Sequence, residues 1–278
     1  MPDSQKRSRF NARLSKEKLA NDRERAVRQA LAEDVGSGDV TAALVGVAQM
    51  ADATVVVREQ AVLCGCDWFS QAFAEVDREI HVHWSAKDGD RVAPGQVVCK
   101  LDGPARSILT GERTALNFLQ TLSGTATTTA HYVSQVEGTG CRILDTRKTI
   151  PGLRTAQKYA ARIGGAVNHR IGLFDAILIK ENHIASAGSI GGAVRGARAS
   201  SPSLPVEIEV ESVAQVHEAL QTGVERLLLD NFTLDQLREA VQINKDSDEP
   251  AELEASGGIE VDTLRAVAET GVDFISVG

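Results

Sequence analysis

Cysteine is scarce in this sequence of 278 residues, and its four cysteines, Cys64, Cys66, Cys99 and Cys141, are scattered. The one close pair, Cys64 and Cys66, has no second pair that would complete a four-ligand zinc site. The sequence therefore favours reduced thiols over a disulfide framework.

Long apolar runs are absent as well. None reaches the roughly 20 residues that a helix needs to cross a bilayer. The basic start, MPDSQKRSRFNARLSKEK, has no hydrophobic segment behind it that would make it a secretory signal. We therefore expect a cytoplasmic protein with no membrane partner.

Positive charge is in the minority, with 30 Lys and Arg against 38 Asp and Glu and a net charge of −8. An acidic chain of this kind is poorly suited to nucleic acid, so we expect no nucleic-acid partner. One segment, from Arg142 to His183, reverses the balance with eight Lys or Arg against three acids. A basic pocket in an acidic protein predicts a small polyanionic ligand.

The first half of the chain mixes helix and strand patterns. Helical spacing covers 15–34 and 67–76, and alternation typical of strands covers 53–63 and 79–84. Residues 104–136 carry leucines at helical intervals that are interrupted near Ser123 and Gly124, which predicts two linking helices. We expect residues 1–136 to form an N-terminal helix, an α/β sandwich and these linking helices.

The second half repeats one pattern six times: a short apolar run ends in a polar cluster and leads into a helix pattern. The runs are RILDTRK, AILIKENH, VEIEVE, RLLLDN, ELEASGG and DFISVG. Strands that alternate with helices predict a parallel sheet, either a barrel or a doubly wound sheet. Because the reactive side chains end the runs, as they do in barrel enzymes, we expect an α/β fold with an incomplete parallel barrel over 137–278.

Three cations stand out within the basic segment. Lys180 ends an apolar strand pattern, where an unpaired ammonium group would be costly to bury, so we expect it to face an anion. The guanidinium groups of Arg147 and Arg170 suit a planar acid because they can donate paired hydrogen bonds to carboxylates. Taken singly, each of these cations would be an ordinary surface charge.

The acids of VEIEVE alternate, so Glu207, Glu209 and Glu211 share one face of the strand. In a barrel the apolar face meets the helices and the glutamates face inward, with Asp230 beside them on the next strand. Oxygen ligands of this kind suit Mg²⁺ next to a phosphorylated substrate. A salt bridge to Lys148 or Lys180 is the alternative, and the two are compatible.

A phosphate site is expected at the last two strands. Ser256, Gly257 and Gly258 follow one strand and open a helix pattern, an arrangement that presents backbone N–H groups to phosphate. Gly278 ends the last strand, in the region where barrels commonly hold phosphate.

Taken together, these motifs resemble the quinolinate phosphoribosyltransferase family of type II phosphoribosyltransferases. The matching segments are LAEDVGSGDVT, GERTALNFLQTLSG, LDTRKTIPGLR, KYAARIGGAVNHRIGLFDAILIKENHI, VEIEVE, LLLDN and ASGGI. The resemblance implies transfer of phosphoribosyl from phosphoribosyl pyrophosphate to quinolinate, with loss of CO2, to give nicotinate mononucleotide for NAD biosynthesis. The sequence departs from the family in one respect: it stops at SVG, where relatives continue into another loop and terminal helices. A related enzyme that uses nicotinate or another small acid, and a non-catalytic barrel that senses phosphorylated metabolites, are the alternatives.

The resemblance also implies roles for individual residues. Those implied to line the quinolinate pocket are Arg147, His169, Arg170, Lys180 and, as a neighbouring group, His183. Arg113 would complete the site of the other subunit in a homodimer or higher oligomer. Lys148 would contact phosphoribosyl pyrophosphate, Glu209 and Asp230 the Mg²⁺ and ribose, and Ser256, Gly257, Gly258 and Gly278 the 5′-phosphate. Lys148, Lys180, Glu209 and Asp230 would be the catalytic groups.

Overall fold

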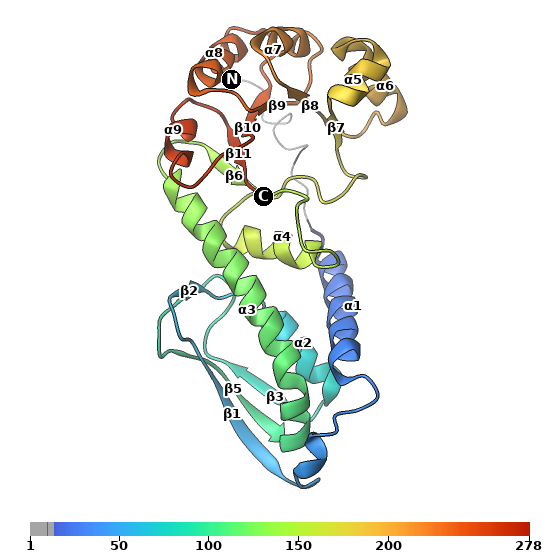
Figure 1. Cartoon of the computed structure of the whole chain (residues 1–278), viewed down its shortest axis with the longest axis vertical. Coiled ribbons are helices and arrows are strands. Elements are labelled where there is room, and N and C mark those ends of the chain that lie inside the picture. Colours follow the sequence, from blue (N-terminus) through green and yellow to red (C-terminus); the bar gives the residue numbers. More distant parts are fainter. Residues whose placement is uncertain (1–9, 11–13) are drawn as a thin grey trace. The chain divides into compact units, whose positions relative to one another are not determined.

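The computed structural model describes residue 10 and residues 14–278, and it divides into two compact units (Figure 1). The barrel unit contains Phe10, His131–Thr149 and Ala166–Gly278, and the sandwich unit contains Leu14–Ala130 and Ile150–Gly165. The basic start of the chain lies, apart from Phe10, outside the described residues. The division therefore differs from a boundary at 137, because 131–136 group with the barrel unit and 150–165 with the sandwich unit.

The sandwich unit is built on an antiparallel sheet of order β1-β5-β3 and a small ladder of β2 with β4. Its elements are α1 (Lys16–Val35), η2 (Ala42–Leu44), β1 (Met50–Val56), β2 (Ala61–Val62), α2 (Cys66–Val76), β3 (His81–Trp84), β4 (Arg91–Val92), β5 (Val97–Pro104), most of α3 (Ala105–Gln135) and α4 (Arg154–Ile163). The helix α2 buries Trp68, Phe69 and Phe73 in the core. Ala156 and Ala160 of α4 belong to the same core, which explains why this helix groups with the N-terminal half.

The prediction of two linking helices is wrong, because α3 is a single helix of 31 residues. Ser123 does not break it: its hydroxyl donates to the carbonyl of Cys64 at 3.1 Å and accepts from the backbone N–H of Cys64 at 3.0 Å. One turn later, Thr127 accepts from the backbone N–H of Val62 at 2.8 Å. These hydroxyls bind a neighbouring segment, and the Thr127 hydroxyl also donates to the carbonyl of Ser123 in the same helix at 2.7 Å, so α3 continues through both residues.

The barrel unit confirms the predicted parallel α/β fold. Its strands are β6 (Arg142–Leu144), β7 (Ile177–Ile179), β8 (Val206–Val210), β9 (Arg226–Asp230), β10 (Glu252–Ser256) and β11 (Phe274–Ser276). They form one parallel sheet of order β6-β11-β10-β9-β8-β7. The order is that of a barrel in which the first strand pairs with the last, and the sheet stays open between β6 and β7.

Helices cover the outer side of this sheet: α5 (Glu181–Ala187), α6 (Ile190–Ser200), α7 (Val213–Leu220), α8 (Leu234–Lys245) and α9 (Leu264–Ala268). The helix α6 contacts β7 and β8, α7 contacts β8, and α9 contacts β11. Within the described part of the chain, no helix has both the length and the apolarity to cross a membrane.

Polar side chains line the inner side of the sheet, in register from strand to strand. Glu207 lies opposite Arg226, which in turn lies opposite Glu252. Two residues further along the strands, a second row contains Glu209 and Glu254. A third row, two residues further again, pairs Asp230 with Ser256. Because side chains alternate along a strand, the apolar residues next to these polar ones in each strand point the other way, towards the helices, and are buried.

Candidate active site

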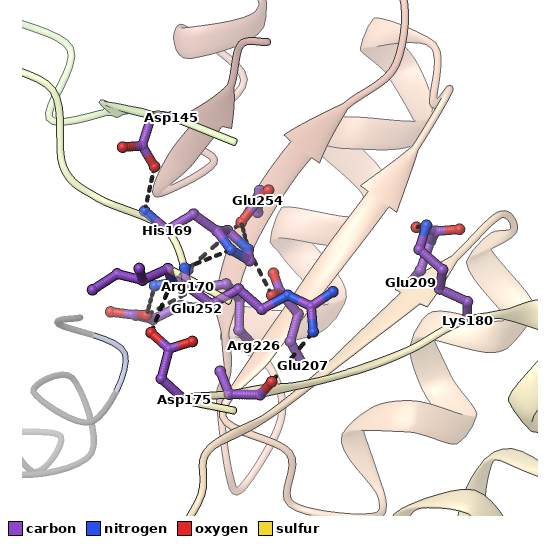
Figure 2. A network of polar contacts seen from close by, with 12 residues as sticks. Asp145, His169, Arg170, Asp175, Lys180, Glu207, Glu209, Arg226, Glu252 and Glu254 are labelled. Atoms are coloured by element: carbon purple, nitrogen blue, oxygen red, sulfur yellow. Dashed lines mark hydrogen bonds and ion pairs between the residues drawn. The ribbon is translucent and has the colours of Figure 1, made fainter. Parts of the chain in front are cut away.

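The ion pair of Lys180 and Glu209 marks the carboxyl ends of β7 and β8 (Figure 2). The ammonium group of Lys180 donates to the glutamate carboxylate, so the salt bridge that the sequence offered as an alternative to a metal is present. Asp230, at the end of β9, belongs to the same group: burial first, and then Glu209, raises the pKa of its carboxyl, whereas Lys180 and Lys148 lower it. The four predicted catalytic residues therefore lie close together.

The carboxylates of this group could also hold a cation. Glu209, Glu211 and Asp230 each offer an oxygen atom, and these atoms lie within 4.8 Å of one another. Three hard oxygen donors suit Mg²⁺, which keeps several waters and shares substrate phosphates as ligands. The donor set therefore fits the expected metal.

Two glycine positions border the same group. A Cβ atom on Gly278 would lie 2.9 Å from Cδ of Lys148 and 3.0 Å from the hydroxyl of Thr146. Gly257 follows β10 with a φ of 92°, and a Cβ atom there would lie 2.2 Å from the side-chain oxygen of Asn231. Only glycine fits the close approach at Gly257, where the left-handed conformation adds a second reason, whereas a side chain at Gly278 would require Lys148 to shift.

The turn after β10 is fixed by the neighbouring strand. The backbone N–H of Asn231 donates to the carbonyl of Ser256 at 2.9 Å, and Gly258 continues the turn with a φ of 58°. The predicted phosphate residues Ser256, Gly257 and Gly258 thus form a tight glycine turn at the carboxyl end of the sheet, next to Asp230.

Arg147 and Arg170 form a second cationic group. Burial first, and then the charge of Arg147, lowers the pKa of Arg170, so the two guanidinium groups lie close to each other. Nε of Arg147 is buried and has no hydrogen-bond partner among the described residues. Two adjacent cations, one with a buried donor that lacks an acceptor, create a site for an anion.

The predicted histidines are held by protein partners. Nε2 of His169 lies 2.8 Å from a carboxylate oxygen of Glu207, and its Nδ1 accepts from the backbone N–H of Arg170 at 2.8 Å (Figure 2). Nδ1 of His183 accepts from the backbone N–H of Lys180 at 3.0 Å, which caps the start of α5. Arg113 lies on the exposed side of α3 in the sandwich unit.

A buried network that the sequence patterns did not predict lies behind His169. The guanidinium group of Arg226 donates to Glu252 at 2.7 Å and 3.2 Å and lies 3.6 Å from Glu254. The alternation of acids and apolar residues in ELEAS, which resembles that in VEIEV, could have indicated that its acids face inward. No sequence pattern indicated that Arg226, at the start of its strand, also faces inward.

Charge in this network is divided unequally between two glutamates. Burial would raise the pKa of Glu207, but His169 and Arg226 outweigh it and lower the pKa to about 2. Burial and the neighbouring charge of Glu207 raise the pKa of Glu254 well above its ordinary value. The pKa values of the two carboxyl groups are therefore shifted in opposite directions, a division typical of two carboxyl groups that share a buried site.

Two family models and several known proteins match this chain. The model of the quinolinate phosphoribosyl transferase C-terminal domain matches residues 125–278, and that of the N-terminal domain matches residues 39–123. A nicotinate-nucleotide pyrophosphorylase [carboxylating] from Mycobacterium leprae is 43% identical over 256 residues, which are 91% of this chain and 90% of the relative. A probable enzyme of the same name from Synechocystis is 41% identical over 251 residues, covering 90% of this chain and 85% of the relative. The solved nicotinate-nucleotide pyrophosphorylase of Francisella tularensis superposes with a TM-score of 0.90 at 43% identity, over 98% of this chain and 94% of that one.

Proposed function

Because this chain belongs to the quinolinate phosphoribosyltransferase family, we propose that its arginine pair and its group of lysines and carboxylates hold the two anionic substrates of that reaction side by side. The chain transfers phosphoribosyl to quinolinate with decarboxylation, a step of NAD biosynthesis. The observation that carries our division of the site is the proximity of Arg147 and Arg170, where a buried donor has no acceptor among the described residues.

Arg147 and Arg170 bind the carboxylates of quinolinate in this proposal. A dianion with two neighbouring carboxylates needs more than one cation, and paired guanidinium groups match its planar shape. His169 lines the same pocket, and its ring is oriented by its bonds to Glu207 and to the backbone of Arg170. Lys180 faces the pocket from the end of β7, and His183 is assigned to its edge.

Lys148, Glu209 and Asp230 serve phosphoribosyl pyrophosphate. The donor set of Glu209 and Asp230, with Glu211 close by, would hold Mg²⁺. When bound, the metal neutralises charge that develops on the pyrophosphate as it leaves. Ser256, Gly257, Gly258 and Gly278 provide backbone N–H groups for the 5′-phosphate at the carboxyl end of the sheet.

The reaction needs no covalent intermediate with the protein. The pyridine nitrogen of quinolinate attacks C1 of the ribose while the bond from C1 to the pyrophosphate oxygen breaks and its electron pair leaves with that oxygen. Glu209 and Asp230 stabilise the positive charge that develops on the ribose. The bond to the carboxylate next to the ring nitrogen then breaks, its electrons pass to the pyridinium ring, CO2 leaves, and a proton takes its place at that carbon.

We further propose a homodimer in which Arg113 reaches the partner's site. The segment that precedes β1 lies along the start of α3, because Thr110 donates to the carboxylate of Asp39 at 2.9 Å. Val40 and Leu44 on this segment are 88% and 85% exposed, and Leu109 on α3 is 52% exposed. Arg113 follows Leu109 by one helical turn and so shares its face. A second copy of the chain would cover this apolar surface.

The cytoplasm is the proposed compartment. The cysteines are free, and Cys64, Cys99 and Cys141 are buried, as expected of a protein that folds in a reducing environment.

Release of labelled CO2 from carboxyl-labelled quinolinate, in the presence of phosphoribosyl pyrophosphate and Mg²⁺, tests the function. We expect release that depends on both substrates, and formation of nicotinate mononucleotide. Consumption of nicotinate without CO2 release would identify a nicotinate enzyme. Binding of phosphoribosyl pyrophosphate without turnover of either acid would identify a sensor.

A further inference from the structure

The loop of residues 168–172, which carries His169 and Arg170, is fixed by hydrogen bonds to the carboxylates of Asp145 and Asp175. The carboxylate of Asp145 accepts from the side chain of Asn168 at 2.6 Å and from the backbone N–H of His169 at 2.8 Å. Asp175 accepts from the backbone N–H groups of 171 and 172 at 2.8 Å and 3.0 Å. Both ends of the loop are therefore fixed, and its middle depends on the His169 ring.

The His169 ring connects a buried carboxylate to the backbone of Arg170. Since Nδ1 accepts the N–H of Arg170, the ring proton lies on Nε2, which donates to Glu207. Glu207 is fully buried, so the orientation of its carboxylate is set by contacts with the protein and not by solvent. A rotation of the ring would break both bonds at once and leave the N–H of Arg170 without this acceptor.

The three residues His169, Glu207 and Glu254 also have the composition of a metal site. The bond to Nδ1 argues against one, because a metal on Nε2 would have to displace the only ring proton. Arg226 supplies the positive charge instead, at 3.6 Å from Glu254. The cluster is therefore better explained by its effect on the loop.

We propose that Glu207 is a positioning residue for the quinolinate pocket, acting through the His169 ring on the backbone of Arg170. The proposal rests on the assignment of Arg170 to quinolinate made above. Its physical reason is that a paired guanidinium contact requires accurate placement, and a shift of about 1 Å in a positioning group can cost a large part of binding or turnover. Because Glu207 lies near the amino end of β8, two residues before Glu209, it need not touch either substrate.

Three variants separate positioning from general stability. Glu207→Leu removes the acceptor of the His169 ring, Glu207→Gln keeps an acceptor oxygen, and Glu252→Leu removes a buried carboxylate that contacts Arg226 but not His169. We expect Glu207→Leu to raise the KM for quinolinate at least about tenfold while kcat and the KM for phosphoribosyl pyrophosphate change less than about threefold. Glu207→Gln and Glu252→Leu should leave the quinolinate KM within about threefold of wild type.

A double variant tests whether Glu207 acts through the His169 ring. If Glu207 acts through the ring, Glu207→Leu should add nothing to the quinolinate KM of His169→Ala. Equal increases in the KM of both substrates, an effect of Glu252→Leu as large as that of Glu207→Leu, or additive effects in the double variant would each overturn the proposal.

Nitrogen NMR of the His169 ring gives a readout that does not depend on activity. Wild type and Glu207→Gln should show a neutral ring protonated at Nε2, and this state should be lost in Glu207→Leu. A ring protonated at Nδ1 in the wild type would refute the positioning role even if the enzyme turns over quinolinate. If Glu207→Leu fails to fold, the proposal is tested by the protonation of the His169 ring in wild type and by the quinolinate KM of Glu207→Gln. A quinolinate KM raised about tenfold in Glu207→Gln would also overturn the proposal.

Discussion

Replacing Glu254 with glutamine should make the stability of the barrel unit less dependent on pH. Burial and the neighbouring charge of Glu207 raise the pKa of Glu254 well above its ordinary value of 4.5. Above pH 4.5, Glu254 keeps its proton in the folded chain and has lost it in the unfolded chain. The free energy of unfolding therefore falls as pH rises towards the folded pKa of Glu254. Glutamine has the shape of the neutral acid and no proton to keep.

The size of the effect follows from a single proton. While Glu254 is protonated in the folded state and ionised in the unfolded state, the free energy of unfolding falls by about 1.4 kcal/mol per pH unit. The difference in the free energy of unfolding between Glu254→Gln and wild type should therefore increase as pH rises above the ordinary glutamate value towards the folded pKa of Glu254. Glu207 does not contribute there, because its folded pKa is lowered, to about 2.

Denaturant unfolding of both proteins at several pH values measures this difference, and the contributions that the two proteins share cancel. Infrared difference spectra give an independent check: as pH rises above 4.5, wild type should keep the carbonyl stretch of a protonated carboxyl group that Glu254→Gln lacks. Parallel dependences of stability on pH in the two proteins, together with no such band, would refute the division of charge between Glu207 and Glu254.

The other predictions concern the site and the thiols. Arg147→Ala should lower kcat/KM for quinolinate by about a hundredfold or more because it removes a paired contact to a carboxylate, with an unchanged circular dichroism spectrum; wild-type kinetics would remove Arg147 from the pocket. Glu209→Ala should shift the Mg²⁺ titration of activity to higher concentration, and an unchanged titration would exclude it as a ligand. Burial raises the pKa of Cys99 to about 12 and raises that of Cys64 as well, so both thiols should react with a disulfide reagent at neutral pH only after unfolding; fast labelling of the native protein would contradict their burial.

Local patterns predicted the strands of the barrel unit and the direction of their side chains. Each of the six apolar runs forms a strand, and the alternation of VEIEV places Glu207 and Glu209 on one face, as it must along a single strand. The polar residue that ends each run was also sufficient to bring Lys180, Glu209 and Asp230 together, because parallel strands end at the same edge of a sheet.

Features that depend on distant parts of the chain could not be predicted in this way. The serine and glycine in α3 look like a helix break until the backbone of Cys64 is placed against Ser123. The same is true of Arg226, whose strand pattern gives no reason for it to face Glu252 and Glu254 until the register of β9 and β10 is known. Likewise, the sequence assigns His169 to a pocket without indicating that Glu207 holds its ring.

A crystal structure of the protein with quinolinate bound would test the division of the site most directly. We expect the two carboxylates of quinolinate to contact Arg147 and Arg170, with the pyridine nitrogen directed towards Glu209 and Asp230. Quinolinate bound away from both arginines, in crystals of a catalytically active preparation, would contradict it.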